Sequence, residues 1–214
     1  MGKTRKELER EVRQNFIVDA TEELFAVNDF DRTTMDEIAA KAQFSKATLY
    51  NYVKSKDELA LLVYQKINRI KVAWAKEKIE SQKNGYDKLY AFCKTYFNFY
   101  KEYPQYLKFQ IYLDHKGLLK SNFSFAHKEF NDYFAEEVKY MEDVYLQGIE
   151  DGSLRDNIDV HTTLDLLYLT LRSVMNQVLL IDKKISIASL DDTSESNYYR
   201  FVEIFLNSLK SDKK

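Results

Sequence analysis

Residues 33–56 read TTMDEIAAKAQFSKATLYNYVKSK, and this stretch decides how the N-terminal part of the chain folds. Thr34 is followed three residues later by Glu37, which is the pattern of a capping box at the start of a helix. The turn at residues 43–45 separates this short helix from a second one, predicted at about residues 45–52. Two short helices joined by a three-residue turn indicate a helix-turn-helix, whose second helix enters the major groove of DNA.

The apolar pattern predicts which face of the second helix would touch DNA. Leu49 and Val53 are expected to point inward and to pack on Ile38. The opposite face offers donors that suit phosphates and base edges, namely Lys46, Thr48, Tyr50 and Asn51. From residue 38 to residue 56 the chain has four lysines (41, 46, 54 and 56) and no acidic residue. A solvated lysine-rich face is the alternative interpretation, but the position of these lysines around the helix-turn-helix favours phosphate binding.

Two segments, FDRTTMDEIA (30–39) and FSKATLYNYVKSK (44–56), together resemble the DNA-binding domain of the TetR family of transcriptional regulators. The resemblance covers about residues 10–60, and GIEDGSLR (148–155) is similar to the segment before the last two helices of that family. The resemblance implies that DNA is contacted by Thr34, Ser45, Lys46, Thr48, Tyr50, Asn51, Tyr52 and Lys56. Of these, Thr34 and Lys56 would bind the DNA backbone. The family usually has Gly, Gly and Phe at the positions that Gln43, Ala47 and Val53 hold in this chain. Because of these differences, the resemblance does not indicate which DNA bases the protein reads.

Helical periodicity continues through the rest of the chain, which has only 5 Gly and 1 Pro among 214 residues. The fold class predicted is therefore all-α. We expect an N-terminal three-helix helix-turn-helix domain at residues 1–54 and a C-terminal helical effector-binding and dimerisation domain at residues 55–214. The helices are predicted at about residues 6–27, 34–42, 45–52, 55–82, 86–102, 105–113, 125–150, 160–181 and 197–209, with a solvated loop at 183–196.

Several classes of protein are disfavoured by the sequence. The net charge is −2, so a basic surface can only be local. Cys93 is the single cysteine and offers no metal-ligand spacing, and His115, His127 and His161 form no metal or catalytic motif. We therefore expect no enzyme, no metal and no cofactor. The N-terminal residues lack the apolar stretch of a signal peptide, and residues 164–181 are too polar for a membrane span, so we expect a soluble cytoplasmic protein without a membrane partner.

Two helices near the C-terminus carry apolar residues at alternating steps of three and four. The first set is Leu164, Leu167, Leu171, Val174 and Val178, and the second is Tyr198, Val202, Phe205 and Leu209. Such a seam is typical of a helix that packs on a partner helix, and an internal core seam is the alternative. In the family that the chain resembles, these helices form a dimeric four-helix bundle. That implies a homodimer on a palindromic operator.

The central helices are rich in aromatic residues and suggest a ligand pocket. The candidates to line it are Trp74, Phe92, Tyr96, Phe109, Phe134 and Tyr145. Each is also compatible with ordinary core, and the high Tyr and Phe content is compatible with genome composition. An aromatic pocket suits an apolar, aromatic or planar cationic effector.

The resemblance implies how such a chain would work. The long helix from Ser55 would shift on effector binding, and the regulator, expected to be a repressor, would leave its double-stranded operator DNA. The rival interpretation is a helical carrier of lipids or small molecules whose helix-turn-helix is vestigial. The two differ in one observable, because only the regulator would show salt-dependent DNA binding.

Overall fold

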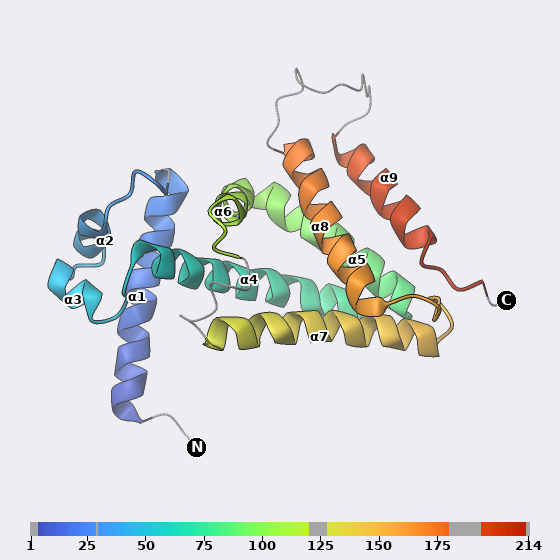
Figure 1. Cartoon of the computed structure of the whole chain (residues 1–214), viewed down its shortest axis with the longest axis horizontal. Coiled ribbons are helices and arrows are strands. Elements are labelled where there is room, and N and C mark those ends of the chain that lie inside the picture. Colours follow the sequence, from blue (N-terminus) through green and yellow to red (C-terminus); the bar gives the residue numbers. More distant parts are fainter. Residues whose placement is uncertain (1–3, 29, 120–127, 180–193, 213–214) are drawn as a thin grey trace. The chain divides into compact units, whose positions relative to one another are not determined.

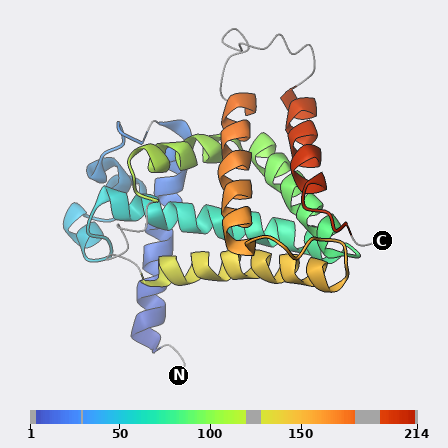
Figure 2. The ribbon, with the colours of Figure 1, turned by 45° about the vertical axis from the view of Figure 1, so that its right-hand side comes forward.

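The computed structural model describes residues 4–28, 30–119, 128–179 and 194–212, without the side chains of residues 128–137, 178, 179 and 194. In these ranges the chain forms nine α-helices (Figures 1 and 2), and the only β pairing among them is an isolated bridge between Leu154 and Lys210. The prediction of an all-α fold is confirmed.

The chain divides into two compact units. The N-terminal unit comprises residues 1–69 and 108–131, and the C-terminal unit comprises residues 70–107 and 132–214. Helices α4 (Lys56–Glu80) and α6 (Pro104–His115) each contribute residues to both units. The boundary predicted between residues 54 and 55 separates a DNA-binding part from an effector-binding and dimerisation part. This division of roles stays a prediction.

Three helices and the start of α4 share one core in the N-terminal unit (Figure 1). They are α1 (Arg5–Val27), α2 (Met35–Lys41) and α3 (Lys46–Tyr50), and α2 packs against both others. The core consists of Ile17, Ile38, Ala39, Leu49, Val53 and Leu59. Burying an aliphatic side chain of this kind contributes roughly 1.5–3 kcal/mol, so these contacts fix how α3 lies on α1. The prediction that Leu49 and Val53 point inward is confirmed.

Polar side chains define the starts of α2, α3 and α4. Thr34 forms a complete capping box, since its hydroxyl accepts from the Glu37 amide at 3.2 Å and the Glu37 carboxylate accepts from the Thr34 amide at 2.7 Å. Ser45 caps α3 by accepting from the Thr48 amide at 3.1 Å. Before α4 the Ser55 hydroxyl accepts from the Glu58 amide, and the Glu58 carboxylate accepts from the Lys54 amide. These two bonds resemble a capping box in which the carboxylate reaches the residue before the serine.

The turn between α2 and α3 has a left-handed residue. Gln43 has φ 60°, and it is the one described non-glycine residue with positive φ. This conformation costs roughly 1–2 kcal/mol for a side chain with a Cβ. The Phe44 amide donates to the Ala39 carbonyl at 2.9 Å, which closes the turn despite that cost.

The C-terminal unit is built from α5 (Gly85–Glu102), most of α7 (Lys128–Glu150), α8 (Val160–Leu179), α9 (Ser194–Asn207) and the adjoining parts of α4 and α6. Helices α8 and α9 lie side by side in Figures 1 and 2, and both pack against α5. Tyr198 of α9 is fully buried and donates its hydroxyl hydrogen to the Cys93 carbonyl at 2.6 Å. This bond satisfies a polar group that burial would otherwise leave without a partner.

The segment GIEDGSLR (148–155) holds the start of α5. A Cβ on Gly85 would lie 2.3 Å from the Gly148 Cα, so the backbones of α5 and α7 can meet this closely only because residue 85 is glycine. A Cβ on Gly148 would instead meet the Leu154 side chain, at 2.4 Å. The Asp151 carboxylate accepts from the Gly85 amide at 2.8 Å, and the Ser153 hydroxyl accepts from the Tyr86 amide at 3.1 Å. These two bonds satisfy amides that have no partner within the helix.

The helix boundaries follow the prediction to within three residues where they are described. Pro104 is the first residue of α6, a position where its missing amide hydrogen costs nothing. The predicted start of α7 at residue 125 lies outside the described residues, as do residues 183–193 of the predicted loop. Residues 194–196, which were predicted to belong to that loop, are the first residues of α9. None of the described helices has the length and apolar character needed to cross a membrane.

Candidate nucleic-acid interface and ligand pocket

The outer face of α3 carries the polar side chains that the sequence placed there. Lys46 and Asn51 are exposed, and Tyr50 has 46% of its surface exposed. Thr48 is half-buried, and its hydroxyl is hydrogen-bonded to the Ser45 hydroxyl at 2.7 Å. The predicted direction of these side chains agrees with the structure. Their contact with DNA stays a prediction.

Tyr52 has a packing role at the end of α3. Its ring lies 6.0 Å from the ring of Phe44, and the Arg10 guanidinium lies 5.6 Å from its centroid. The Gln14 amide also donates to the Tyr52 carbonyl at 3.4 Å. These contacts join α1 to the end of α3, so Tyr52 helps to hold α3 in place whether or not it touches DNA.

Two lysines of the acid-free stretch are paired with acids from neighbouring elements. Lys46 lies 2.7 Å from Asp36, and this hydrogen bond raises the pKa of the Lys46 ammonium. Lys41 lies 2.7 Å from Glu23 of α1. Because both pairs are exposed and such pairs are weak, a phosphate can compete with either carboxylate. Lys54 also has an exposed side chain.

Lys56 supports the loop between α1 and α2. Its ammonium donates to the carbonyls of Phe30, Asp31 and Thr33 at 2.8, 3.3 and 2.9 Å. It also lies 4.5 Å from the centroid of the Phe30 ring. Since an ammonium has three donor hydrogens, these three carbonyls account for all of them. The structure therefore gives Lys56 a part in positioning Thr34, and the predicted phosphate contact stays a prediction.

The same loop is bound to the C-terminal half of α6, which sequence reasoning missed. The Tyr112 hydroxyl donates to the Asp31 carboxylate at 2.8 Å, and this bond lowers the pKa of Asp31. Lys116 lies 3.3 Å from the same carboxylate. The Phe30 and Tyr112 rings are 4.5 Å apart. These partners are about 80 residues apart in the chain, and no local pattern indicates such a pairing.

Phe109 belongs to this aromatic cluster, which corrects its predicted place in a ligand pocket. Its ring lies 5.4 Å from Phe25 and 6.1 Å from Phe30. All three rings lie in the N-terminal unit. The helical period on α6 showed that Phe109 is buried, but it could not show which partners bury it.

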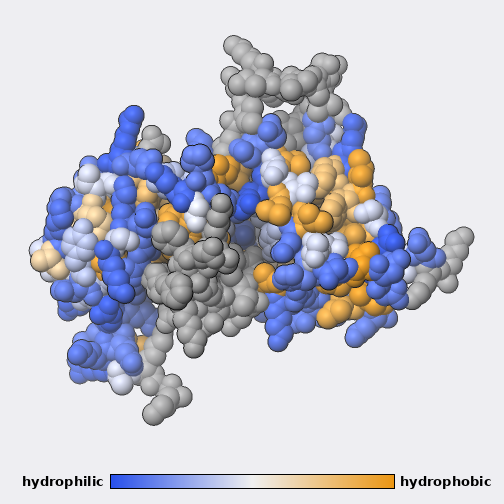
Figure 3. All heavy atoms as spheres, in the orientation of Figure 1, coloured by the Kyte–Doolittle hydropathy of each residue, from blue (hydrophilic) through white to orange (hydrophobic). Residues whose placement is uncertain are grey.

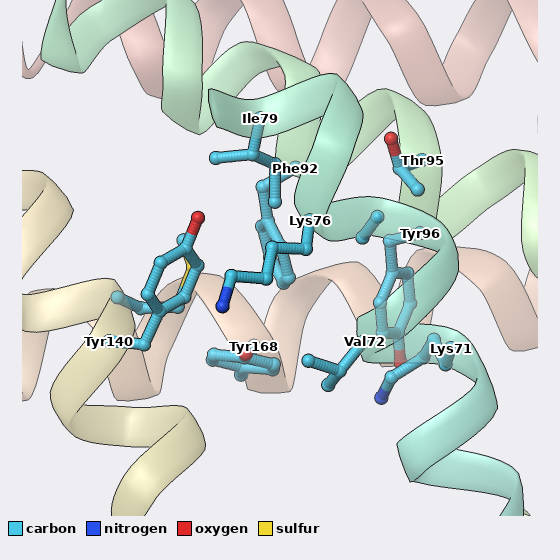
Figure 4. Close-up of a pocket in the computed structure, with 11 residues that line it drawn as sticks. Lys71, Val72, Lys76, Ile79, Phe92, Thr95, Tyr96, Tyr140 and Tyr168 are labelled. Carbon is cyan, nitrogen blue, oxygen red and sulfur yellow. The ribbon is translucent and has the colours of Figure 1, made fainter. Parts of the chain in front are cut away.

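A pocket lies within the C-terminal unit between α4, α5, α7 and α8 (Figure 4). Its empty space is about 390 Å³ when the solvent in its open mouth is included. The predicted residues Phe92 and Tyr96 both line it. The full lining among the described side chains is Lys71, Val72, Ala75, Lys76, Ile79, Phe92, Thr95, Tyr96, Tyr140, Met141 and Tyr168.

Two other predicted pocket residues lie elsewhere. Trp74 is 36% exposed and packs on Phe99 at 5.9 Å, with the Lys78 ammonium 3.8 Å from its centroid. Tyr145 is fully buried and donates to the Arg155 carbonyl at 3.3 Å. The side chain of Phe134 lies outside the described residues. Sequence reasoning also missed Lys71, Lys76, Tyr140 and Tyr168, since their helices face several neighbours.

The predicted dimer seam is corrected for most of its residues. Within the single chain the exposed fraction is 5% or less for Leu164, Leu167, Leu171, Tyr198, Val202 and Leu209. A side chain without exposed surface has none to offer a second chain, so the alternative of an internal core seam holds for these six. Val174 and Phe205 are half-buried, and the side chain of Val178 lies outside the described residues.

The apolar surface of α8 and α9 is formed by other residues. Leu166 and Leu169 of α8 are 52% and 50% exposed, and Ile204 of α9 is 67% exposed. Figure 3 shows hydrophobic residues gathered over these two helices on the face in view. Exposed apolar patches of this kind mark interaction surfaces.

Comparison with known proteins agrees with this architecture. Residues 17–63 match the family model described as bacterial regulatory proteins, tetR family. The fatty acid metabolism regulator protein of Bacillus subtilis (strain 168) is 20% identical over 177 residues, which cover 83% of this chain and 89% of that protein.

Solved structures share the fold over nearly the whole chain. The fatty acid degradation regulator FadR from Bacillus halodurans has a TM-score of 0.66 at 16% identity, covering 96% of this chain and 97% of that chain. FadR from Bacillus subtilis in complex with stearoyl-CoA has a TM-score of 0.65 at 16% identity, covering 91% and 98%. KstR2 of Mycobacterium tuberculosis, a ketosteroid transcriptional regulator, has a TM-score of 0.59 at 18% identity, covering 94% and 96%. The helix-turn-helix region, residues 17–63, is thus similar to bacterial regulatory proteins of the tetR family, and the chain as a whole shares the fold of these solved structures.

Proposed function

We propose that this chain is a ligand-responsive transcription repressor, which binds a palindromic operator as a homodimer and leaves it when a small molecule occupies the pocket. The observation that carries the proposal is the outer face of α3, where Lys46, Tyr50 and Asn51 project from a helix-turn-helix that matches the family. Hydroxyl, amide and ammonium groups of this kind contact phosphates and base edges in the major groove. Such a protein works on chromosomal DNA, so its place would be the cytoplasm.

The roles of the eight predicted DNA-binding residues differ in this proposal. Tyr50, Asn51 and Lys46 read or anchor DNA directly, because their side chains are exposed. Ser45 and Thr34 stand at helix starts, where their hydroxyls cap amides and can also reach a phosphate. The Thr48 hydroxyl is hydrogen-bonded to the Ser45 hydroxyl and can reach the same phosphate. Tyr52 and Lys56 act mainly by holding α3 and the preceding loop in position.

A second copy of the chain is the partner in this proposal, and the exposed side chains of Leu166, Leu169 and Ile204 form its interface. A two-fold dimer presents two copies of α3, so the operator should contain inverted half-sites about one helical turn apart or a multiple of it.

The small molecule would occupy the pocket of the C-terminal unit. Since α4 supplies pocket residues and also starts beside α3, a shift of this helix on ligand binding would change the spacing of the two recognition helices. A ligand can drive this only through different affinities for the two states. One solved relative holds stearoyl-CoA, so a fatty acyl group is the first apolar ligand to test.

Selection of binding sites from random duplex DNA, followed by gel shifts, tests the proposal. We expect the enriched sequences to contain an inverted repeat, and the logarithm of the affinity to fall linearly with the logarithm of salt concentration. A fatty acyl ligand should then release the bound DNA. A chain that enriches no sequence at low salt and still binds acyl ligands would instead be a helical carrier, and the repressor proposal would fail.

A further inference from the structure

The N-terminal part of α1 projects beyond the core of the helix-turn-helix. The buried residues of α1 begin at Ile17, and every residue from 5 to 13 is exposed. In Figures 1 and 2 this part of the helix extends past α2 and α3. Residues 5–16 form about 18 Å of helix at about 1.5 Å per residue. Because this length of helix adds no buried residue to the core, its surface is open to a partner.

The helix gathers three cations of this part on one face. Lys6, Arg10 and Arg13 are spaced by four and three residues, so their side chains are neighbours along the helix surface. Ile17 follows Arg13 by four residues, and it belongs to the core shared with α2 and α3. The three cations, called the basic row below, therefore continue the side of α1 that packs on the helix-turn-helix.

The glutamates that alternate with these cations in the sequence have other partners. The Glu7 carboxylate accepts from the Thr4 amide at 2.7 Å in a capping box at the start of α1. Glu9 lies 3.0 Å from Arg5, on another side of the helix. In the described part of the chain, no cation of the basic row takes part in an ion pair. An anion can therefore reach the row without first displacing a carboxylate.

The basic row adjoins the end of α3. The Arg10 guanidinium lies 5.6 Å from the centroid of the Tyr52 ring, and Gln14, one turn further along α1, donates to the Tyr52 carbonyl at 3.4 Å. Tyr52 directly follows the exposed residues Tyr50 and Asn51. The row thus begins where the proposed DNA-reading face of α3 ends.

The lysines nearer to α3 are largely engaged within the protein. Lys46 is paired with Asp36, Lys41 is paired with Glu23, and the Lys56 ammonium donates to three loop carbonyls. Duplex DNA carries one negative charge for about every 1.7 Å of its axis, and the whole chain has a net charge of −2. Attraction to DNA must therefore come from local cations, and the basic row supplies three beside the recognition helix.

We propose that Lys6, Arg10 and Arg13 bind the phosphate backbone of the DNA beside each half-site, so that the protein contacts DNA beyond the bases that α3 reads. The guanidinium fork of arginine matches two phosphate oxygens, and the lysine ammonium binds as a point charge. Contacts of this kind fix the position of the protein and carry no sequence information. The inference rests on the proposed function, in which α3 lies in the major groove of operator DNA.

The double variant Lys6→Gln, Arg13→Gln tests the row and keeps Arg10, which also packs on Tyr52. Glutamine is a good helix former, and both positions are exposed, so thermal unfolding should be unchanged. The slope of the logarithm of affinity against the logarithm of salt concentration should fall by about 0.9 for each lost phosphate contact, which is about 3.6 for a dimer. Between about 200 and 50 mM salt, the advantage of the wild type should therefore grow about 150-fold.

Two comparisons assign this effect to the row and to the DNA backbone. The control is Lys94→Gln, Lys139→Gln, which makes the same change of charge at two exposed lysines of the C-terminal unit, and its salt slope should equal that of the wild type. Operator duplexes that end at the inverted repeat are then compared with duplexes about ten base pairs longer on each side. The wild type should gain more affinity from the longer duplex than the double variant does, whatever the sequence of the added base pairs.

Three results would overturn the proposal. They are an unchanged salt slope in the double variant, an equal fall in the control, and an equal gain from the longer duplex in the wild type and the double variant. The basic row would then be a solvated charged face, as most such runs are.

Failure of the proposed function has a different signature. If the wild type selects an operator and the double variant keeps its salt slope, the repressor stands and the role of the row is removed. If the wild type selects no operator, the repressor fails. The row is then judged on random duplex DNA, where a reduced slope in the double variant supports it and an unchanged slope or no binding overturns it.

Discussion

Tyr50 is the residue of α3 with the clearest opportunity to touch DNA. It is 46% exposed, and its neighbour Leu49 is fully buried, so the helix is fixed while the phenol ring is free to meet a base or phosphate. We expect Tyr50→Ala to weaken specific binding by about 1–3 kcal/mol, the usual effect of one lost contact. Gel shifts on the selected operator measure this. Tyr103→Ala, at a partly exposed tyrosine of the C-terminal unit, should leave the affinity unchanged.

Lys54 and Lys56 are two residues apart and should behave differently. Lys56→Met removes the donor to three loop carbonyls, so the N-terminal unit should lose stability by roughly 1.5–3 kcal/mol. Lys54→Met should leave the stability unchanged. It should reduce the slope of the logarithm of affinity against the logarithm of salt concentration by about 1, as expected for one lost phosphate contact. Thermal unfolding and salt titrations of operator binding separate the two. A reduced salt slope in Lys56→Met would mean that Lys56 contacts phosphate after all.

The junction of α5 and α7 depends on the absence of a side chain at Gly85. A Cβ at Gly85 would overlap the backbone at Gly148, so Gly85→Ala should destabilise the protein by at least about 1–3 kcal/mol, the usual effect of overpacking. Gly152→Ala is the matched comparison, since a Cβ there meets nothing within 4 Å and only its φ of 78° is unfavourable. Gly152→Ala should therefore lower the free energy of unfolding by roughly 1–2 kcal/mol. A smaller loss for Gly85→Ala than for Gly152→Ala in chemical denaturation would contradict the close approach of the helices.

The start of α8 carries a histidine among acids. His161 lies 2.8 Å from Glu142 of α7 and 3.6 Å from Asp165, and the hydrogen bond to Glu142 is the main reason that its pKa is raised. Since the folded pKa lies above the unfolded value of about 6.5, the stabilisation is complete below that pH and is lost as pH rises through the folded pKa. An NMR titration should place the midpoint of His161 above 6.5. Glu142→Gln should lower it, and an unchanged midpoint would exclude this pairing in solution.

In the proposed homodimer the two chains would meet through residues that the single chain leaves exposed. Leu166 and Ile204 project from α8 and α9, and a charged group on such an interface disfavours association. We expect the wild-type protein to have twice the mass of one chain in light scattering, and the double variant Leu166→Glu, Ile204→Glu to have the mass of one chain. Leu146→Glu, at an exposed leucine of α7, should remain dimeric. A wild-type monomer at micromolar concentration would reject the homodimer.

Much of the fold could be predicted because its signals are local. The capping pair Thr34 and Glu37, the turn at Gln43 and the inward position of Leu49 each depend on residues a few positions apart. The predicted DNA-facing side of α3 follows from the same helical period. Local patterns of this kind fix where a helix starts, where it ends and which face is apolar.

The lining of the pocket and the exposed apolar face of α8 and α9 could not be predicted in the same way. Helices in the C-terminal unit are apolar on more than one side, so periodicity identified Leu164 and Phe109 as buried without saying against what. The structure places Leu164 inside the chain and Leu166 outside, and it moves Phe109 into a cluster with Phe25 and Phe30.

By itself, the sequence determined the helical class, the helix-turn-helix at residues 33–56 and the side chains that project from its second helix. Only the tertiary structure decided the partners of those side chains. It directs Lys56 to loop carbonyls, pairs Lys46 with Asp36, and brings Lys71 and Lys76 to an aromatic pocket. The physical reason is that helix formation and capping depend on neighbours within one or two turns. The environment of a charge depends instead on which distant helices remove it from water or supply its counter-ion.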